Sequence, residues 1–148
     1  MTEFTQRRKS QDVYLIVAND SEEFALSLRY TSRLATANNA HVGIMANLDE
    51  ESFQHWSKVE DMMRKEIREN TEKKLWGFAK KVHELSGQIP VLYLTAGKAE
   101  DAVLKTLEED ENIKMLILSR SVSSGGPGVL VNYFTSKGLG KLKTPLVL

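Results

Sequence analysis

The sequence has no cysteine, no long hydrophobic run and no excess of charge of one sign. Without cysteine, disulfide bridges, thiolate nucleophiles and thiolate metal sites are excluded. The 20 basic and 20 acidic residues balance, so the overall charge does not favour nucleic acid as a partner. The first apolar run, residues 13–18, is too short for a signal peptide or a membrane span. These absences predict a cytoplasmic protein that binds neither nucleic acid nor membranes.

Proline and glycine are also scarce, at 3 and 9 of 148 residues, which excludes a collagen-like chain. Hydrophobic residues make up 41% of the chain and charged residues 27%, which is the balance of an ordinary globular protein. The length fits one domain with a hydrophobic core. Residues 1–11 are mainly polar and are predicted to be a disordered lead. The domain is therefore expected to span residues 12–148.

Five short apolar stretches alternate with segments of helical periodicity. The stretches are continuous and contain β-branched residues, which is typical of strands buried on both faces of a parallel sheet. We expect strands at 13–18, 41–48, 91–94, 113–118 and 145–148, and helices at about 22–37, 53–85, 98–109 and 129–137. The inward face of the longest helix is expected to carry Val59, Met63, Ile67, Leu75, Phe78, Val82 and Leu85. This alternation predicts a single α/β domain with a doubly wound parallel sheet.

Polar segments follow three of the expected strands and are candidates for a binding site. In an open parallel sheet, ligands bind at the carboxyl ends of the strands, near the switch in strand order. Asn19-Asp20-Ser21 follows the first strand, Asn47 lies at the end of the second, and residues 119–128 follow the fourth. We expect these segments to converge at one edge of the sheet. Asp20 and Ser21 equally suit a turn and a helix cap without any ligand.

The run SSGGPG at residues 123–128 is the most distinctive local feature. Small residues let backbone N–H groups approach an anion closely, and a following helix N-terminus adds free donors. The same run fits a surface loop in which glycine only serves the turns. Neither a Walker A lysine pattern nor a Gly-x-Gly-x-x-Gly motif is present. Three widely separated histidines and no cysteine predict no metal site.

Several stretches, taken in order, are similar to one known family. Residues 17–22 (VANDSE) are similar to an Asp-x-Ser-Glu ending of a first strand, and residues 97–103 (GKAEDAV) to a Gly-x-Pro-Ala-Glu-x-Ile turn into a helix. Residues 115–118 (MLIL) precede a Ser/Gly loop, and residues 144–148 (TPLVL) are similar to a closing Cys-Pro-Val-x-Val strand. With this element order, the chain resembles the universal stress protein family. Residues 53–63 and 126–128 look like a bacterial subgroup of it.

The resemblance implies a Rossmann-like, five-stranded parallel sheet of order 3-2-1-4-5 and homodimers joined through the last, C-terminal edge strand. The family's ATP-binding branch carries Gly-x2-Gly-x9-Gly-Ser/Thr directly after the fourth strand. Gly125, Gly128 and Gly138 have this spacing, but Leu139 occupies the Ser/Thr position. The first glycine is also displaced, because Ser119 is the residue that directly follows the expected strand. The ATP-binding motif is therefore degenerate.

From the resemblance we expect a homodimeric stress-response module that binds an adenine nucleotide, ATP or AMP, with Mg²⁺ in the case of ATP. The family's adenine-side aspartate falls on Asn19, whose amide hydrogen-bonds a base with different donors and acceptors. The alternative is a dimerisation and partner-binding module of the same fold without nucleotide, which the degenerate motif favours. No paired acid and base supports an enzyme. The expected binding residues are Asn19, Asp20, Ser21, Asn47, Ser119, Gly125, Gly126, Gly128 and Gly138.

Overall fold

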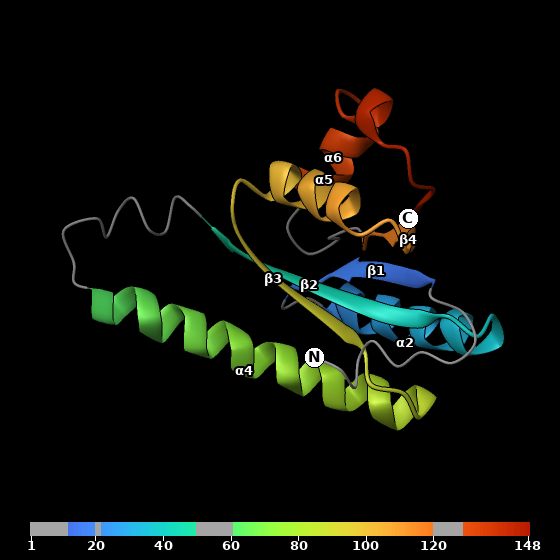
Figure 1. Cartoon of the computed structure of the whole chain (residues 1–148), viewed down its shortest axis with the longest axis horizontal. Helices are drawn as coiled ribbons and strands as arrows, with labels where there is room; N and C mark the ends of the chain where they lie inside the picture. Colours follow the sequence, from blue (N-terminus) through green and yellow to red (C-terminus); the bar gives the residue numbers. More distant parts are fainter. Residues whose placement is uncertain (1–11, 20–21, 50–60, 120–128) are drawn as a thin grey trace.

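The computed structural model describes residues 12–19, 22–49, 61–119 and 129–148. Strands and helices alternate along the chain as the sequence predicts (Figure 1). The strands are β1 (Val13–Val17), β2 (His41–Asp49), β3 (Val91–Gly97), β4 (Ile113–Ile117) and β5 (Leu146–Val147). The helices are α2 (Glu22–Ala37), α4 (Asp61–Ser86), α5 (Ala99–Glu109), α6 (Val129–Phe134) and the 3-10 helix η1 (Leu139–Lys141).

The five strands form one parallel sheet with the order β3-β2-β1-β4-β5, which confirms the order that the resemblance implies. The pairing of β1 with β2 ends at Val17 and Met45, whereas β2 and β3 remain paired as far as Asp49 and Gly97. The β2–β3 pair therefore projects beyond the end of β1. The third strand was expected to end at Leu94, but β3 continues to Gly97. Its last three residues are strand because they pair with β2, which the sequence alone does not show.

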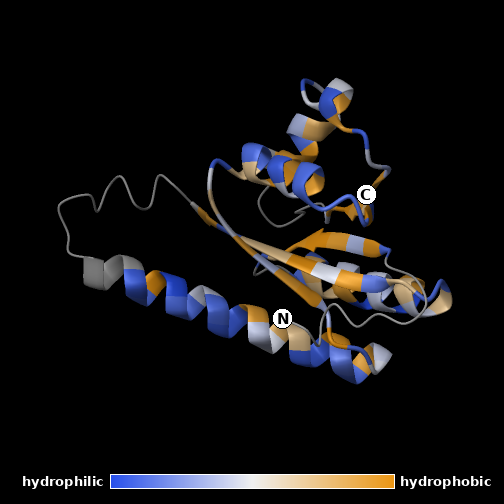
Figure 2. Cartoon of the chain, viewed as in Figure 1, coloured by the Kyte–Doolittle hydropathy of each residue, from blue (hydrophilic) through white to orange (hydrophobic). Residues whose placement is uncertain are grey.

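A hydrophobic core lies on each face of the sheet. Along β1, Tyr14 and Ile16 point into the core under α2 and α4, and Val13 and Leu15 into the core under α5 and α6. Figure 1 shows these two helix pairs on opposite sides of the sheet, and Figure 2 shows the strands as its most hydrophobic part. The first four residues of β1, Val13 to Ile16, are buried, as expected for a continuous apolar run in a parallel sheet.

The helix α4 ends where the sequence predicts, at Gly87, whose φ of 74° is left-handed and favours glycine. Of its expected inward residues, Leu75 and Val82 are buried, but Leu85 is 37% exposed. The expected residues 53–60 of this helix lie outside the described residues, as does the predicted disordered lead, 1–11. In the part of the chain that the structure describes, no helix is both long and apolar enough to cross a membrane.

Candidate functional site

A crevice is expected where β1 and β4 separate at their carboxyl ends. The two strands are paired up to Ile16 and Ile117. Beyond that point, the Ala18 N–H donates to Met45 of β2 over 2.8 Å, and the Leu118 N–H donates to Val147 of β5 over 2.9 Å. Beyond their paired residues, the segment after β1 therefore continues along β2, and the segment after β4 continues along β5. This divergence is the topological switch point at which parallel sheets bind ligands.

Asn19 and Ser119 face each other across this switch point. The Nδ2 of Asn19 lies 3.5 Å from the Oγ of Ser119, which is a long hydrogen bond between residues a hundred positions apart. Asn19 is exposed and Ser119 half-buried, so both are placed at the mouth rather than in the core. Of the residues expected after the first and fourth strands, the structure describes Asn19 and Ser119 and brings these two together.

Asn47 lies on the projecting β2–β3 pair, and its side chain is bonded to β3. Its Nδ2 donates to the carbonyl of Gly97 over 2.8 Å, and its Oδ1 accepts from the Thr95 hydroxyl over 2.9 Å. The Thr95 hydroxyl also lies 3.3 Å from the Ala46 carbonyl. The Asn47 amide therefore ties two strands together, and a ligand contact by Asn47 is left mainly to its backbone.

Thr95 is a residue of this edge that the sequence did not single out as a site residue. Its pairing opposite Asn47 depends on the β2–β3 register, which two separate polar residues in the sequence do not reveal. In the sequence, this pair could be recognised only as two polar residues near the ends of two expected strands.

The N-terminus of α5 follows this edge directly and is acidic. Gly97 turns the chain with a φ of 105°, and Lys98 is the N-cap residue. Glu100 and Asp101 occupy the first turn, and the Lys98 Nζ lies 4.0 Å from a Glu100 oxygen. Negative side chains already stabilise this positive helix end, so it is not suited to bind a phosphate group.

Gly138, the last glycine of the expected motif, is packed against Tyr133. A Cβ at this position would overlap the Tyr133 ring, and the Gly138 N–H donates to the Tyr133 carbonyl over 2.8 Å. Glycine is thus needed here for a local turn after α6. Leu139 is 57% exposed. The phosphate-binding role of Gly138 stays a prediction.

The other expected residues, Asp20, Ser21, Gly125, Gly126 and Gly128, lie outside the described residues. Among the residues that are described, no group of three His, Asp or Glu side chains could hold a metal ion. Burial, with a smaller effect of the Asp12 charge, raises the pKa of Tyr14 above its usual value. Tyr14 lies near the amino end of β1, away from the crevice, so this perturbed group is not part of the candidate site.

No protein-family model matches the sequence, and no curated protein matches it. Solved structures do match across nearly the whole chain. Universal stress protein UspA from Lactobacillus plantarum has a TM-score of 0.74 at 10% identity, covering 95% of this chain and 98% of that chain. A universal stress protein from Archaeoglobus fulgidus in complex with dAMP has a TM-score of 0.61 at 14% identity, covering 92% and 94%. A universal stress protein in complex with cAMP has a TM-score of 0.59 at 13% identity, covering 93% and 94%.

At such identities the similarity establishes the fold. The sheet order, the two helix layers and the coverage of more than nine-tenths of each chain agree with the resemblance found in the sequence. This chain has the fold of the universal stress proteins.

Proposed function

We propose that the chain is a universal stress protein, a homodimeric stress-response module that binds an adenine nucleotide in the crevice between β1 and β4. The observation that carries the proposal is the placement of Asn19 and Ser119 side by side at the switch point. Proteins of the same fold form complexes with dAMP and cAMP. A ligand at the switch point also agrees with the general rule for open parallel sheets.

Each part of the nucleotide has a proposed partner. Asn19, with the neighbouring Asp20 and Ser21 and the Asn47 backbone, binds the base and ribose, because an amide supplies both a donor and an acceptor. Ser119 and the glycine run that follows it bind the phosphates, with Mg²⁺ when the ligand is ATP. Gly125, Gly126 and Gly128 supply backbone N–H groups to them, and Gly138 ends the motif.

We propose binding rather than catalysis. Asn19, Asn47, Thr95 and Ser119 carry no charge and provide no acid and base pair. The charged side chains that follow this edge, Lys98, Glu100 and Asp101, belong to the start of α5. The absence of cysteine and the balanced charge support a cytoplasmic module with neither nucleic-acid nor membrane partners.

Thermal unfolding with and without nucleotide tests the proposal. A ligand that binds only the folded state at about 100 times its Kd stabilises by about 2.7 kcal/mol. For a chain of this size, that corresponds to a Tm increase of about 5–10 °C. We expect it with millimolar AMP or with ATP and Mg²⁺, and we expect Asn19→Leu to reduce it.

Asn70→Leu is the matched control, because Asn70 is exposed on α4, far along the chain from the crevice residues. It is expected to keep the full nucleotide shift. If millimolar nucleotide leaves the Tm of the unmodified protein unchanged, with and without Mg²⁺, the nucleotide proposal is wrong.

The second candidate is a dimerisation and partner-binding module without nucleotide. Two observations favour it: the exposed Leu139 at the Ser/Thr position, and the local packing reason for glycine at position 138. This candidate predicts no thermal shift with nucleotide but the same dimer.

A further inference from the structure

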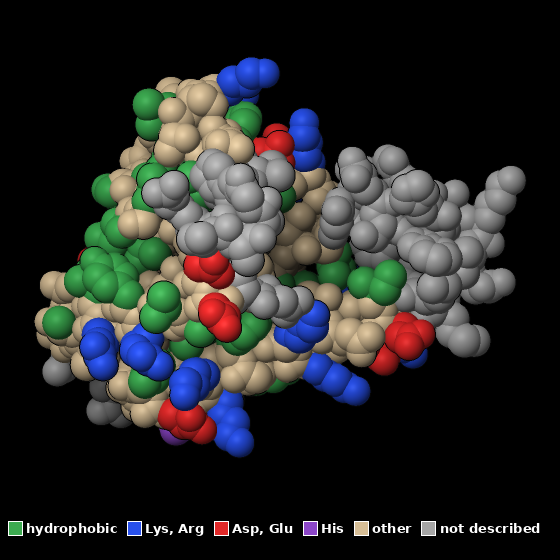
Figure 3. Space-filling view, turned by 180° about the vertical axis from the view of Figure 1, so that it is seen from behind, with side chains coloured by type: hydrophobic (Ala, Val, Ile, Leu, Met, Phe, Trp, Pro, Cys, Tyr) green, Lys and Arg blue, Asp and Glu red, His purple; other side chains and the backbone are tan. Residues whose placement is uncertain are grey.

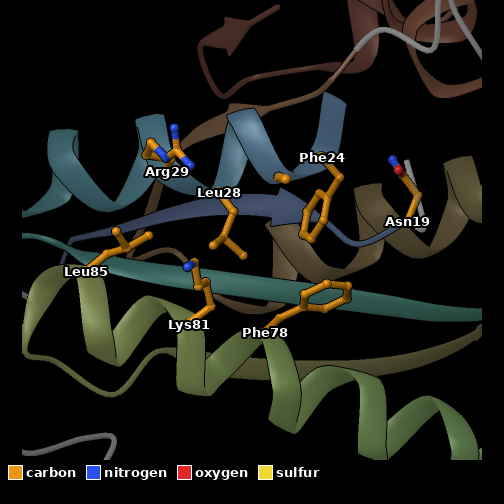
Figure 4. Close-up of a pocket in the computed structure, with 8 residues that line it drawn as sticks. Asn19, Phe24, Leu28, Arg29, Phe78, Lys81 and Leu85 are labelled. Carbon is orange, nitrogen blue, oxygen red and sulfur yellow. The ribbon is translucent and has the colours of Figure 1, made fainter. Parts of the chain in front are cut away.

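A groove separates α2 from α4 on the outer side of the sheet. Its cavity has a volume of about 300 Å³ and is lined by side chains of both helices, with Asn19 at one end (Figure 4). This volume is at the lower limit of small-molecule sites. The groove lies over the α2–α4 face, whereas the nucleotide site proposed at the switch point lies at the carboxyl ends of β1 and β4.

The floor of the groove consists of apolar side chains that pack against one another. Phe24 and Leu28 of α2 are 2% and 3% exposed. The rings of Phe24 and Phe78 meet edge to face, with centroids 4.8 Å apart at 72°. Leu85 stands at the rim, 37% exposed, where the helical pattern predicted a core residue. Over this buried floor, Ala25, Phe78 and Leu85 leave apolar surface accessible to water, which a hydrocarbon ligand would cover.

Two cations flank this floor, one from each helix. Arg29 of α2 and Lys81 of α4 line the same half of the groove, opposite the end at Asn19 (Figure 4). Both are exposed, and neither forms an ion pair with a described residue. None of the described lining residues is acidic. Lys and Arg side chains also gather along the side of the molecule that α4 occupies (Figure 3).

We propose that this groove binds a single-chain anionic amphiphile of the fatty carboxylate class. The acyl chain lies on Leu28 and the Phe24–Phe78 pair, and the carboxylate lies between Arg29 and Lys81. A methylene needs about the volume of a liquid water molecule, ~30 Å³. The cavity of about 300 Å³ therefore holds a chain of roughly ten carbons.

The lining also excludes other small anions. Asn19 is the only uncharged polar side chain among the described lining residues. On the apolar floor, away from Asn19, Arg29 and Lys81, the hydroxyl groups of a sugar or nucleotide would lose water without gaining hydrogen-bond partners, which is unfavourable. An acyl chain has no such groups. The charge of the rim selects an anionic head over a neutral or cationic one.

Binding of octanoate, decanoate and dodecanoate below their micelle concentrations, measured by calorimetry, tests the proposal. Removing two methylenes is expected to weaken the Kd by about tenfold. Decanol is expected to bind several-fold more weakly than decanoate, and decyltrimethylammonium more weakly still. AMP is expected not to displace decanoate, because the carboxylate lies in the half of the groove opposite Asn19, the one described residue that the two sites share.

Three variants locate the site. Ala25 is exposed on α2 and lines the groove, so Ala25→Phe fills it and is expected to abolish decanoate binding. The double variant Arg29→Gln with Lys81→Gln is expected to weaken binding at least tenfold. Lys80→Gln removes an exposed neighbouring cation that does not line the groove, and is expected to change nothing.

Three results would overturn the proposal. They are no saturable decanoate binding, equal affinity for decanoate and decyltrimethylammonium, and decanoate binding that survives Ala25→Phe. Binding of an acidic amphipathic peptide, with no binding of decanoate, would show that the groove takes a helix instead.

Discussion

At the scale of single residues, the crevice edge depends on side chains that serve the fold as well as the site. Asn47 and Thr95 are bonded to each other at 2.9 Å across β2 and β3, and Asn47 also binds the Gly97 carbonyl. The sequence predicted Asn47 as a binding residue from its place at a strand end. The cross-strand register that turns its amide towards β3 is a tertiary feature, so a single sequence did not contain it.

Replacing Asn47 by alanine is expected to lower the free energy of unfolding by about 1–2 kcal/mol, because two part-buried hydrogen bonds are lost. Urea denaturation measures the change. Asn70→Ala, at an exposed helix position, is expected to stay within about 0.5 kcal/mol of the unmodified protein. Equal stability of the two variants would mean that the Asn47 bonds do not hold the strand ends.

Gly138 allows a sharper comparison, because Gly140 lies two residues further along in open space. An added Cβ would overlap the Tyr133 ring at Gly138 but would meet nothing within 4 Å at Gly140. Gly138→Ala is therefore expected to destabilise the protein by about 1–3 kcal/mol. Gly140→Ala is expected to change stability little.

The double variant Gly138→Ala with Tyr133→Leu is expected to recover part of this loss, since the overlapping ring is gone. If Gly138→Ala instead leaves the urea midpoint unchanged but weakens AMP binding, the local packing explanation is contradicted and the phosphate role supported.

At the scale of elements, apolar runs and helical periodicity predicted the order of strands and helices. The observed ends of these elements differ from the expected ones where tertiary contacts determine them. Instead of reaching residue 137, α6 ends at Phe134, where turns fold the chain against Tyr133, and η1 follows. The groove beside Leu85 could not be predicted from the sequence either. Apolar residues at helical spacing show the same pattern whether they line a groove or fill a core.

The edge strand β5 carries the prediction about the dimer. β4 bonds to the carbonyls of Pro145 and Val147, so the backbone groups of Leu146 and Leu148 point away from β4. Leu148 is 57% exposed. We expect a second copy to pair there, and we expect Leu148→Pro, which removes an outward N–H group, to weaken the dimer.

Sedimentation equilibrium measures this effect, with Leu139→Ala as a control that changes another exposed leucine outside the strand and keeps its bonded N–H group. A monomer at high micromolar concentration for the unmodified protein would contradict the proposed dimer. A dimer unaffected by Leu148→Pro would place the interface elsewhere on the molecule.

At the scale of the whole molecule, two proposed ligand sites of different chemistry adjoin at Asn19. The nucleotide site proposed at the switch point has the polar side chains Asn19 and Ser119 and lies at the carboxyl ends of β1 and β4. The groove between α2 and α4 is apolar with a cationic rim. Only the first could be expected from the sequence, because the alternation gives the strand ends and the family resemblance implies the strand order, whereas the groove depends on how two helices pack.

The most direct measurement is to titrate the ¹⁵N-labelled protein with AMP and to record, by NMR, which backbone amide groups change their chemical shifts. A nucleotide site at the switch point predicts saturable shifts at Asn19, Asn47 and Ser119, with Leu28 and Lys81 in the groove unaffected. No shift at millimolar AMP, or shifts confined to the groove, would contradict a nucleotide site at the switch point.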